Sequence, residues 1–104
     1  WIKQVLDSGA AGIIAPMVNT PAQARTVVGR AKYPPQGSRG VGTSRALGYG
    51  YGIADYVARA NEDIAVIVQA EHIEAVQHID AIAATPGVDA LFVGPFDLSL
   101  SMGK

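Results

Sequence analysis

The sequence predicts an α/β fold in which parallel strands alternate with helices. Residues 64–71 and 90–93 are short, mostly apolar runs with the length and composition of strands buried on both faces. The first run ends in Glu71, and Asp97 follows the Gly-Pro pair that ends the second. Sheets of this kind, closed into a barrel or open, carry their chemistry at the carboxyl ends of the strands. We therefore expect Glu71 and Asp97 to lie at one functional edge.

The chain is expected to open with the end of a helix. Apolar residues recur at helical spacing over residues 2–6, and Gly9 is well placed to cap the carboxyl end. Residues 12–18 form the next expected strand. The helix that follows should begin at Thr20 as the N-cap. Pro21 occupies its first position, and Gln23 completes a capping box.

A long glycine-rich segment interrupts the alternation of strands and helices. The second helix should end near Lys32, because the Pro-Pro pair at 34–35 cannot continue it. Residues 37–52 contain six glycines together with Arg39 and Arg45. A loop of this length within a compact domain is usually functional or mobile. The sequence does not assign it a role.

The remaining elements repeat the strand and helix pattern. A helix is expected over residues 53–61, followed by the strand at 64–71. A further helix over residues 72–84 precedes the strand at 90–93. Its apolar stripe is predicted to consist of Ile73, Val76, Ile79 and Ile82.

Composition excludes several functional classes. The net charge of −1 gives no electrostatic basis for binding nucleic acid or an anionic membrane. No apolar run approaches the roughly 18 residues that a membrane span requires. There is no cysteine, so disulfides and thiolate metal sites are excluded, and a cytoplasmic location is expected. The chain lacks an initiator Met and ends abruptly, which suggests a piece of a longer protein.

The two acidic residues suggest a metal site. Carboxylates at the ends of adjacent parallel strands start roughly 5 Å apart at the backbone. Two such charges repel each other unless a cation lies between them. Mg²⁺ prefers oxygen ligands and usually takes one or two carboxylates plus substrate and water. The alternative is that Glu71 and Asp97 each stabilise the start of a following helix. Spacing alone leaves both interpretations open.

Five other polar residues are candidates for a functional or structural role. Gln69 should face the same side as Glu71, where it would bind a substrate oxygen or make a buried hydrogen bond. His72 is expected in the first helical turn without binding metal, and His78 is expected to be exposed. Arg39 and Arg45 would either bind an anion with the glycine amides or anchor the loop, and anchoring or a subunit contact is favoured.

Five short motifs occur in an order that is typical of one enzyme family. They are Ala15-Pro-Met-Val18, Lys32-Tyr-Pro-Pro35, Arg39-Gly-Val-Gly42, Val68-Gln-Ala-Glu71 and Gly94-Pro-Phe-Asp-Leu-Ser99. Together they resemble the 4-hydroxy-2-oxoheptanedioate / 2-dehydro-3-deoxyglucarate aldolase family. These are class II pyruvate aldolases related to the citrate lyase beta subunit. The resemblance covers essentially the whole chain.

The resemblance implies a TIM (β/α)8 barrel, of which residues 1–104 would be the central part, about three βα units, with both ends truncated. It implies that Glu71 and Asp97 bind a divalent metal, with Mg²⁺, Mn²⁺ or Co²⁺ as candidates. Gln69 and the backbone amides of Phe96 and Asp97 match substrate-binding positions. Phe96 replaces a residue that is typically small, which leaves the aldehyde substrate open.

The catalytic His and the pyruvate-binding Arg of that family lie on earlier strands, so no catalytic residue is assigned within this chain. The implied reaction is metal-dependent aldol cleavage or condensation of a 4-hydroxy-2-oxo acid, giving pyruvate and an aldehyde. The resemblance also implies a homo-oligomer, commonly a hexamer. The alternatives are an enolpyruvate-type phosphotransferase barrel and a non-catalytic barrel fragment. We expect the 104 residues alone to be inactive.

Overall fold

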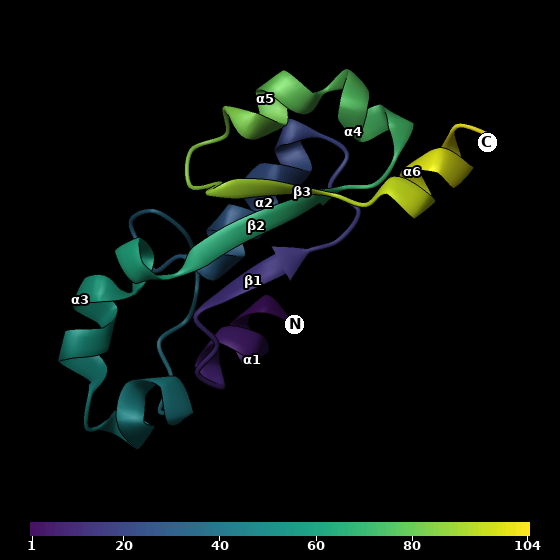
Figure 1. Ribbon diagram of the computed structural model, residues 1–104. Coiled ribbons are helices and arrows are strands. Elements are labelled where there is room, and N and C mark those ends of the chain that lie inside the picture. The colour runs from purple at the N-terminus through teal and green to yellow at the C-terminus, as the bar shows by residue number, and fades with distance from the viewer.

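The computed structural model describes residues 1–104, in which three parallel strands form one sheet in the order β1-β2-β3. The strands are β1 (Gly12–Ala15), β2 (Ala65–Ala70) and β3 (Ala90–Val93). The helices are α1 (Ile2–Asp7), α2 (Pro21–Ala31), the 3-10 helix η1 (Arg45–Gly50), α3 (Ile53–Asp63), α4 (Ile73–Gln77), α5 (Ile79–Ala83) and α6 (Pro95–Ser101). Figure 1 shows the sheet between α4 and α5 at one end and α3 at the other. The predicted parallel α/β class is therefore confirmed.

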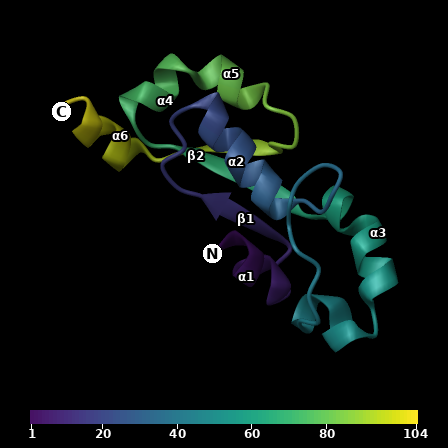
Figure 2. The ribbon, with the colours of Figure 1, turned by 180° about the vertical axis from the view of Figure 1, so that it is seen from behind.

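One face of the sheet packs against helices. Ile13, Val66 and Val68 alternate with outward-facing neighbours and are buried. Side chains of α2 and α5, including Val28 and Ile82, complete two apolar clusters against this face. In Figure 2, which is seen from behind, α2 crosses in front of the strands, whereas no helix covers the strands in Figure 1.

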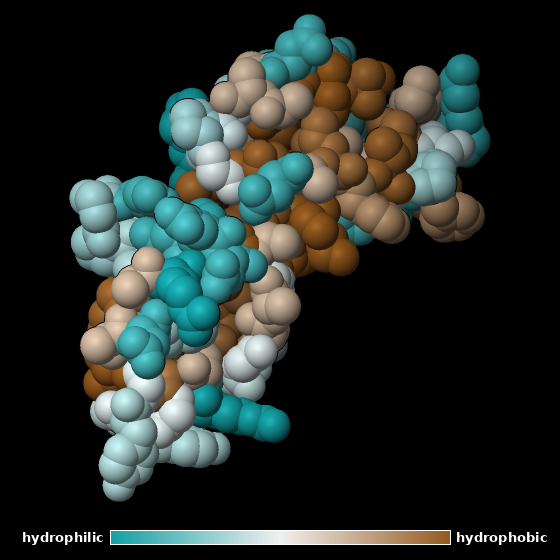
Figure 3. Space-filling model, turned by 60° about the vertical axis from the view of Figure 1, so that its left-hand side comes forward, coloured by the Kyte–Doolittle hydropathy of each residue, from teal (hydrophilic) through white to brown (hydrophobic).

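The opposite face of the sheet is bare and largely apolar. The pairing register aligns Ile14 with Ile67 and Gln69 with Phe92, so these side chains share that face. Ile14 is 54% exposed and Phe92 is 52% exposed. Figure 3 shows a continuous group of hydrophobic residues on the surface in the upper half of the molecule. Contiguous apolar surface of this extent usually marks a site of contact with other groups.

The start of α2 follows the predicted capping pattern. Thr20 has an extended backbone, and its hydroxyl accepts a hydrogen bond from the Gln23 backbone N–H at 3.1 Å. The Gln23 side chain accepts from the Asn19 backbone N–H at 2.8 Å, one residue before the N-cap. The cap is therefore confirmed, although its second half binds a different backbone group from the usual capping box.

Replacing Thr20 with alanine is expected to lower the free energy of unfolding by about 1 kcal/mol, because the Gln23 N–H loses its acceptor. Urea unfolding of the intact protein measures this. Thr26→Ala is the matched control: its hydroxyl bonds only the Ala22 carbonyl oxygen within the same helix. Equal effects of the two substitutions would contradict the capping role.

Two predicted elements were wrong for identifiable reasons. The first strand was expected over 12–18 but ends at Ala15, because Pro16 has no N–H to donate and Met17 turns to φ 53°. The helix expected over 72–84 is divided into α4 and α5 at His78, whose φ/ψ of −111°/15° is not helical. The sequence predicts no element after Gly94, where the structure has α6.

The predicted apolar stripe of the divided helix was wrong at Val76, which is 44% exposed. Ala75 is fully buried in its place, together with Ile82, and Ile79 packs against the same cluster. The predicted stripe assumes one continuous helix, and the break at His78 changes which residues of α4 and α5 face the sheet together. No helix of the structure is long and apolar enough to cross a bilayer.

Candidate functional site

Glu71 lies immediately after the carboxyl end of β2, and its side chain is buried, with 8% of the residue exposed. One carboxylate oxygen, Oε2, accepts a hydrogen bond from the Met17 backbone N–H at 2.9 Å. Glu71 does not cap the next helix. The N-cap of α4 is His72, whose Nδ1 accepts from the Glu74 backbone N–H at 3.1 Å. The capping alternative for Glu71 is therefore wrong.

Asp97 lies in the first turn of α6, which follows the carboxyl end of β3. Its side chain is exposed, and it makes no cap hydrogen bond. A carboxylate in the first turn still interacts favourably with the helix dipole, so part of the helix-stabilising alternative stands for Asp97. That contribution does not use either carboxylate oxygen as a hydrogen-bond acceptor, and both remain open to another ligand.

Gly94 lies between the two acidic residues: it packs against the Glu71 side chain and precedes the helix that carries Asp97. Its N–H donates to the Ala70 carbonyl oxygen at 3.1 Å, which joins the ends of β2 and β3. A Cβ on Gly94 would lie 2.8 Å from both Cγ and Oε1 of Glu71. The Glu71 carboxylate thus lies against the backbone that leads into α6, three residues before Asp97. Both acidic residues are at the same carboxyl edge of the sheet, as their positions in the sequence predict.

Neither acidic residue at this edge is neutralised by a basic side chain. The ion pairs of the structure are Lys3 with Asp7 and Arg39 with Asp7. No group of three or more His, Cys, Asp or Glu side chains gathers anywhere in the chain. The edge therefore offers two carboxylates and no third acidic or imidazole ligand.

Gln69 and Phe96 flank this edge. Gln69 lies on β2 with its side chain on the bare face, where it is partly exposed, and its backbone carbonyl accepts from the Val18 N–H at 3.2 Å. Phe96 is the second residue of α6 and is 76% exposed.

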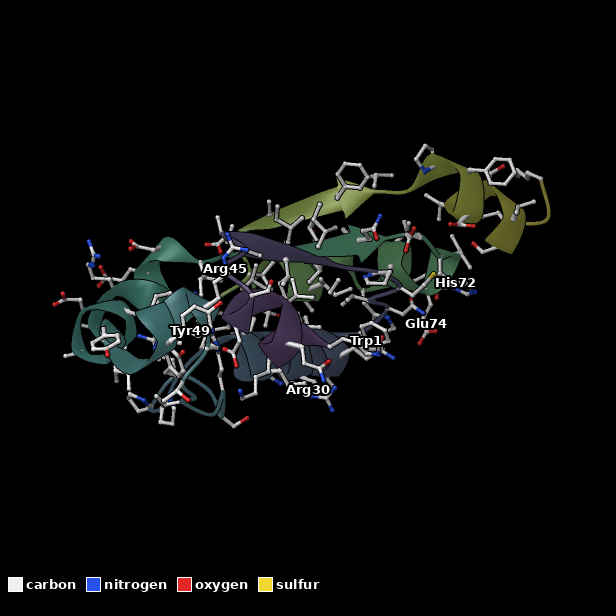
Figure 4. All side chains as sticks on the ribbon, turned by 90° about the horizontal axis from the view of Figure 1, so that it is seen from below. Trp1, Arg30, Arg45, Tyr49, His72 and Glu74 are labelled. Atoms are coloured by element: carbon white, nitrogen blue, oxygen red, sulfur yellow. The ribbon has the colours of Figure 1, made fainter.

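The histidines and Arg45 lie outside this pair of acids. His72 caps α4, and His78 is exposed at the junction of α4 and α5, as expected. Figure 4 shows His72 and Glu74 at the end of the molecule that carries α6, whereas Arg45 and Tyr49 lie toward the other end. Arg45 is exposed and forms no ion pair.

Arg39 anchors the long loop, which confirms the favoured interpretation. The residue is 2% exposed, and its Nη2 donates to Asp7 Oδ1 at 2.7 Å and to the Tyr56 hydroxyl at 3.1 Å. The guanidinium carbon lies 4.5 Å from the Tyr33 ring centroid, which adds a cation–π contact. Burial raises the pKa of Asp7, but hydrogen bonds from Lys3 and Arg39 outweigh burial, so its pKa is below the ordinary 3.8.

Sequence patterns missed two backbone groups that contact Glu71. The Met17 N–H is aimed at Glu71 by a left-handed conformation with φ 53°, which a methionine rarely adopts. Gly94 leaves the space in which the carboxylate lies. A strand followed by Pro16 signals a turn, but nothing local indicates that the turn reaches a residue 54 positions away.

A parallel α/β sheet with a pair of unneutralised carboxylates at its carboxyl edge is typical of α/β proteins whose functional sites lie at the strand ends. The family model of the HpcH/HpaI aldolase/citrate lyase family matches residues 1–104. The chain therefore belongs to the HpcH/HpaI aldolase/citrate lyase family.

Curated relatives support this membership. The chain is 51% identical over 104 residues to a hydroxypyruvate/pyruvate aldolase of Chromohalobacter salexigens, covering 98% of this chain and 41% of the relative. It is 50% identical over 103 residues to a 2-keto-3-deoxy-L-rhamnonate aldolase of Salmonella paratyphi B, covering 98% and 39%. The chain thus spans about two fifths of the length of these relatives.

Solved structures show the same fold. A family member from Burkholderia cenocepacia superposes with a TM-score of 0.88 at 44% identity, covering 98% of this chain and 41% of that one. Macrophomate synthase superposes with a TM-score of 0.80 at 32% identity, covering 98% and 36%. The similarity extends over almost all of the described chain and a minority of each neighbour.

Proposed function

We propose that residues 1–104 are the central part of a TIM-barrel pyruvate aldolase, which cleaves a 4-hydroxy-2-oxo acid into pyruvate and an aldehyde. The observation that carries this proposal is the pair Glu71 and Asp97 at one carboxyl edge, in a chain whose relatives are named as aldolases. The bare sheet face supports the barrel, because further strands would cover Ile14, Ile67 and Phe92. Family membership favours an aldolase over a phosphotransferase.

The residues present fit a divalent cation such as Mg²⁺, Mn²⁺ or Co²⁺. Glu71 Oε2 has one hydrogen-bond donor, and no basic side chain balances the charge of Glu71 or Asp97. Two carboxylates offer hard oxygen donors, and such cations commonly take one or two carboxylates with substrate and water in the remaining positions. We propose Glu71 and Asp97 as the protein ligands. A bound cation would supply Lewis-acid stabilisation of the negative charge that develops on the keto acid.

The other residues of this edge would position the substrate. The backbone amides of Phe96 and Asp97 lie in the first turn of α6, where N–H groups have no acceptor within the helix. They are proposed to bind the carboxylate of the keto acid. Gln69, at the edge of the bare face, would donate to or accept from a substrate oxygen.

In the proposed cleavage, the bond between C3 and C4 of the keto acid breaks and the 4-hydroxyl loses its proton. C3 takes up a proton and becomes the methyl group of pyruvate, while C4 becomes the aldehyde carbon. No side chain of this chain is assigned to these proton transfers. The intact enzyme is proposed to be a homo-oligomer, as the family resemblance implies.

Removal of the metal tests this proposal. Dialysis of the intact protein against EDTA is expected to abolish pyruvate release, and added Mn²⁺ or Mg²⁺ should restore it, because the uncompensated carboxylates cannot stabilise developing negative charge. A coupled lactate dehydrogenase assay measures the pyruvate. Protein dialysed without EDTA is the control. Full turnover by protein whose metal content is shown to be negligible would reject the metal role.

A further inference from the structure

The carboxylate of Glu71 lies between two pieces of backbone that come from opposite sides. On one side, the Met17 N–H in the connection between β1 and α2 donates to Oε2 at 2.9 Å. On the other side, the backbone of Gly94 lies so close that a Cβ there would be 2.8 Å from Oε1. The side chain is buried, so these contacts restrict where its two oxygens can point.

Met17 adopts an unusual backbone conformation to make this contact. Its φ of 53° lies in the left-handed region, which a non-glycine residue rarely adopts. The methionine side chain is 47% exposed, so its own burial does not explain the conformation. The next residue, Val18, is buried and donates its N–H to the Gln69 carbonyl oxygen at 3.2 Å. The turn is therefore held to β2 at two successive residues.

Gly94 is required for space rather than for its backbone angles. Its φ of −98° is accessible to any residue. Its hydrogen bond to the Ala70 carbonyl oxygen fixes the backbone at the end of β2, so the chain cannot simply move away from a larger side chain. An alanine at this position would meet the Glu71 carboxylate and would have to displace it.

We propose that the Met17 amide and Gly94 are positioning groups that orient Glu71 so that it presents Oε1, and not Oε2, to the cation. The Met17 N–H occupies a lone pair of Oε2 and disfavours two-oxygen coordination. Oε1 lies beside the backbone that leads to Asp97. This inference rests on the proposed function, because it assumes that Glu71 is a metal ligand. Groups that orient a ligand typically change metal affinity by about 10- to 100-fold when they are altered.

A backbone ester at position 17 tests the amide directly. Incorporating the α-hydroxy acid that corresponds to methionine into the intact protein removes the N–H and keeps the side chain. Isothermal titration with Mn²⁺ is expected to show affinity weakened by about 10- to 100-fold. The matched control is the equivalent ester at Val18, which removes the bond to the Gln69 carbonyl but no contact with Glu71. It is expected to retain the wild-type affinity.

Gly94→Ala is the second variant, and it should weaken Mn²⁺ binding by a similar factor. Gly29→Ala is its control, since a Cβ there meets nothing within 4 Å. Melting of each metal-free variant is measured in parallel. A merely structural role would lower the melting temperature while leaving the affinity of the folded protein for Mn²⁺ unchanged.

The results separate this inference from the proposed function. If wild-type protein does not bind Mn²⁺, or Glu71→Gln binds as well as wild type, the proposed metal site fails and the inference fails with it. If Glu71→Gln loses binding while the Met17 ester and Gly94→Ala retain it, only the positioning inference is overturned. Equal losses in the Met17 and Val18 esters would also overturn it, because the effect would then belong to the whole turn.

Discussion

Glu71→Gln in the intact protein is expected to reduce pyruvate release by at least about 10³-fold, since the several kcal/mol that a Lewis acid supplies correspond to this factor. Glutamine has nearly the same size, and its amide oxygen can still accept from the Met17 N–H. The substitution therefore removes a negative charge while keeping the packing of a buried residue. The assay compares kcat and KM with saturating Mn²⁺ present.

Glu74→Gln is the matched control for this substitution. Glu74 lies three residues further along the chain, in the first turn of α4, and its carboxylate forms no ion pair. It should retain wild-type turnover. If Glu71→Gln and Glu74→Gln were equally active, Glu71 would be a buried structural carboxylate and the metal proposal would be rejected.

Asp7→Asn is expected to destabilise the intact protein by about 3–5 kcal/mol, the usual result of removing one partner from a buried ion pair. The Arg39 guanidinium is buried and would keep its charge without a counterion. Its Nε and Nη1 already lack hydrogen-bond partners, and the Tyr56 hydroxyl and the asparagine oxygen, which could still accept from Nη2, carry no charge. Chemical unfolding at neutral pH measures the loss.

Lys3→Met is the control for Asp7→Asn. Lys3 bonds the same carboxylate, but its side chain is 49% exposed, so the change should be below about 1 kcal/mol. Equal losses of unfolding free energy from Lys3→Met and Asp7→Asn would contradict the claim that the buried Asp7–Arg39 pair contributes more than Lys3 does. A double replacement of Asp7 and Arg39 by apolar residues should recover much of the stability, because no buried charge remains.

The pH dependence of stability independently tests how much the ionised Asp7 carboxylate stabilises the fold. Because its pKa is lowered on folding, its contribution is fully present above the ordinary value of 3.8 and is lost as the pH falls through the lower folded-state pKa. The stability of wild-type protein should therefore fall in this acid range more steeply than that of Asp7→Asn. Parallel pH profiles for the two proteins would contradict the assignment.

The strands and the first helix cap could be predicted because local signals specify them. Apolar runs define β2 and β3, Pro and Gly lie on both sides of β3, and Thr20 with Pro21 defines the start of α2. The placement of Glu71 and Asp97 at one edge followed from the rule that parallel strands direct their carboxyl ends to the same side. Each of these inferences needs only neighbouring residues and the topology of the sheet.

Features that depend on contacts between distant residues could not be predicted. The Asp7–Arg39 pair joins positions 32 residues apart, and the bond from Met17 to Glu71 joins positions 54 residues apart. The break at His78 is local, but it could not be predicted either, because no Pro or Gly lies near it in the sequence. There, the backbone N–H and Nδ1 of His78 both contact the Glu74 carbonyl oxygen, and the chain then restarts as α5.

The central claim is that Glu71 and Asp97 share one divalent cation at the carboxyl edge of the sheet. The most direct test is an anomalous difference map from crystals of the intact protein grown with Mn²⁺. A single strong peak is predicted at about 2.0–2.3 Å from an oxygen of each residue, nearer to Oε1 than to Oε2 of Glu71. A map with no peak between these side chains, or with its peak bound by other residues, would contradict the claim.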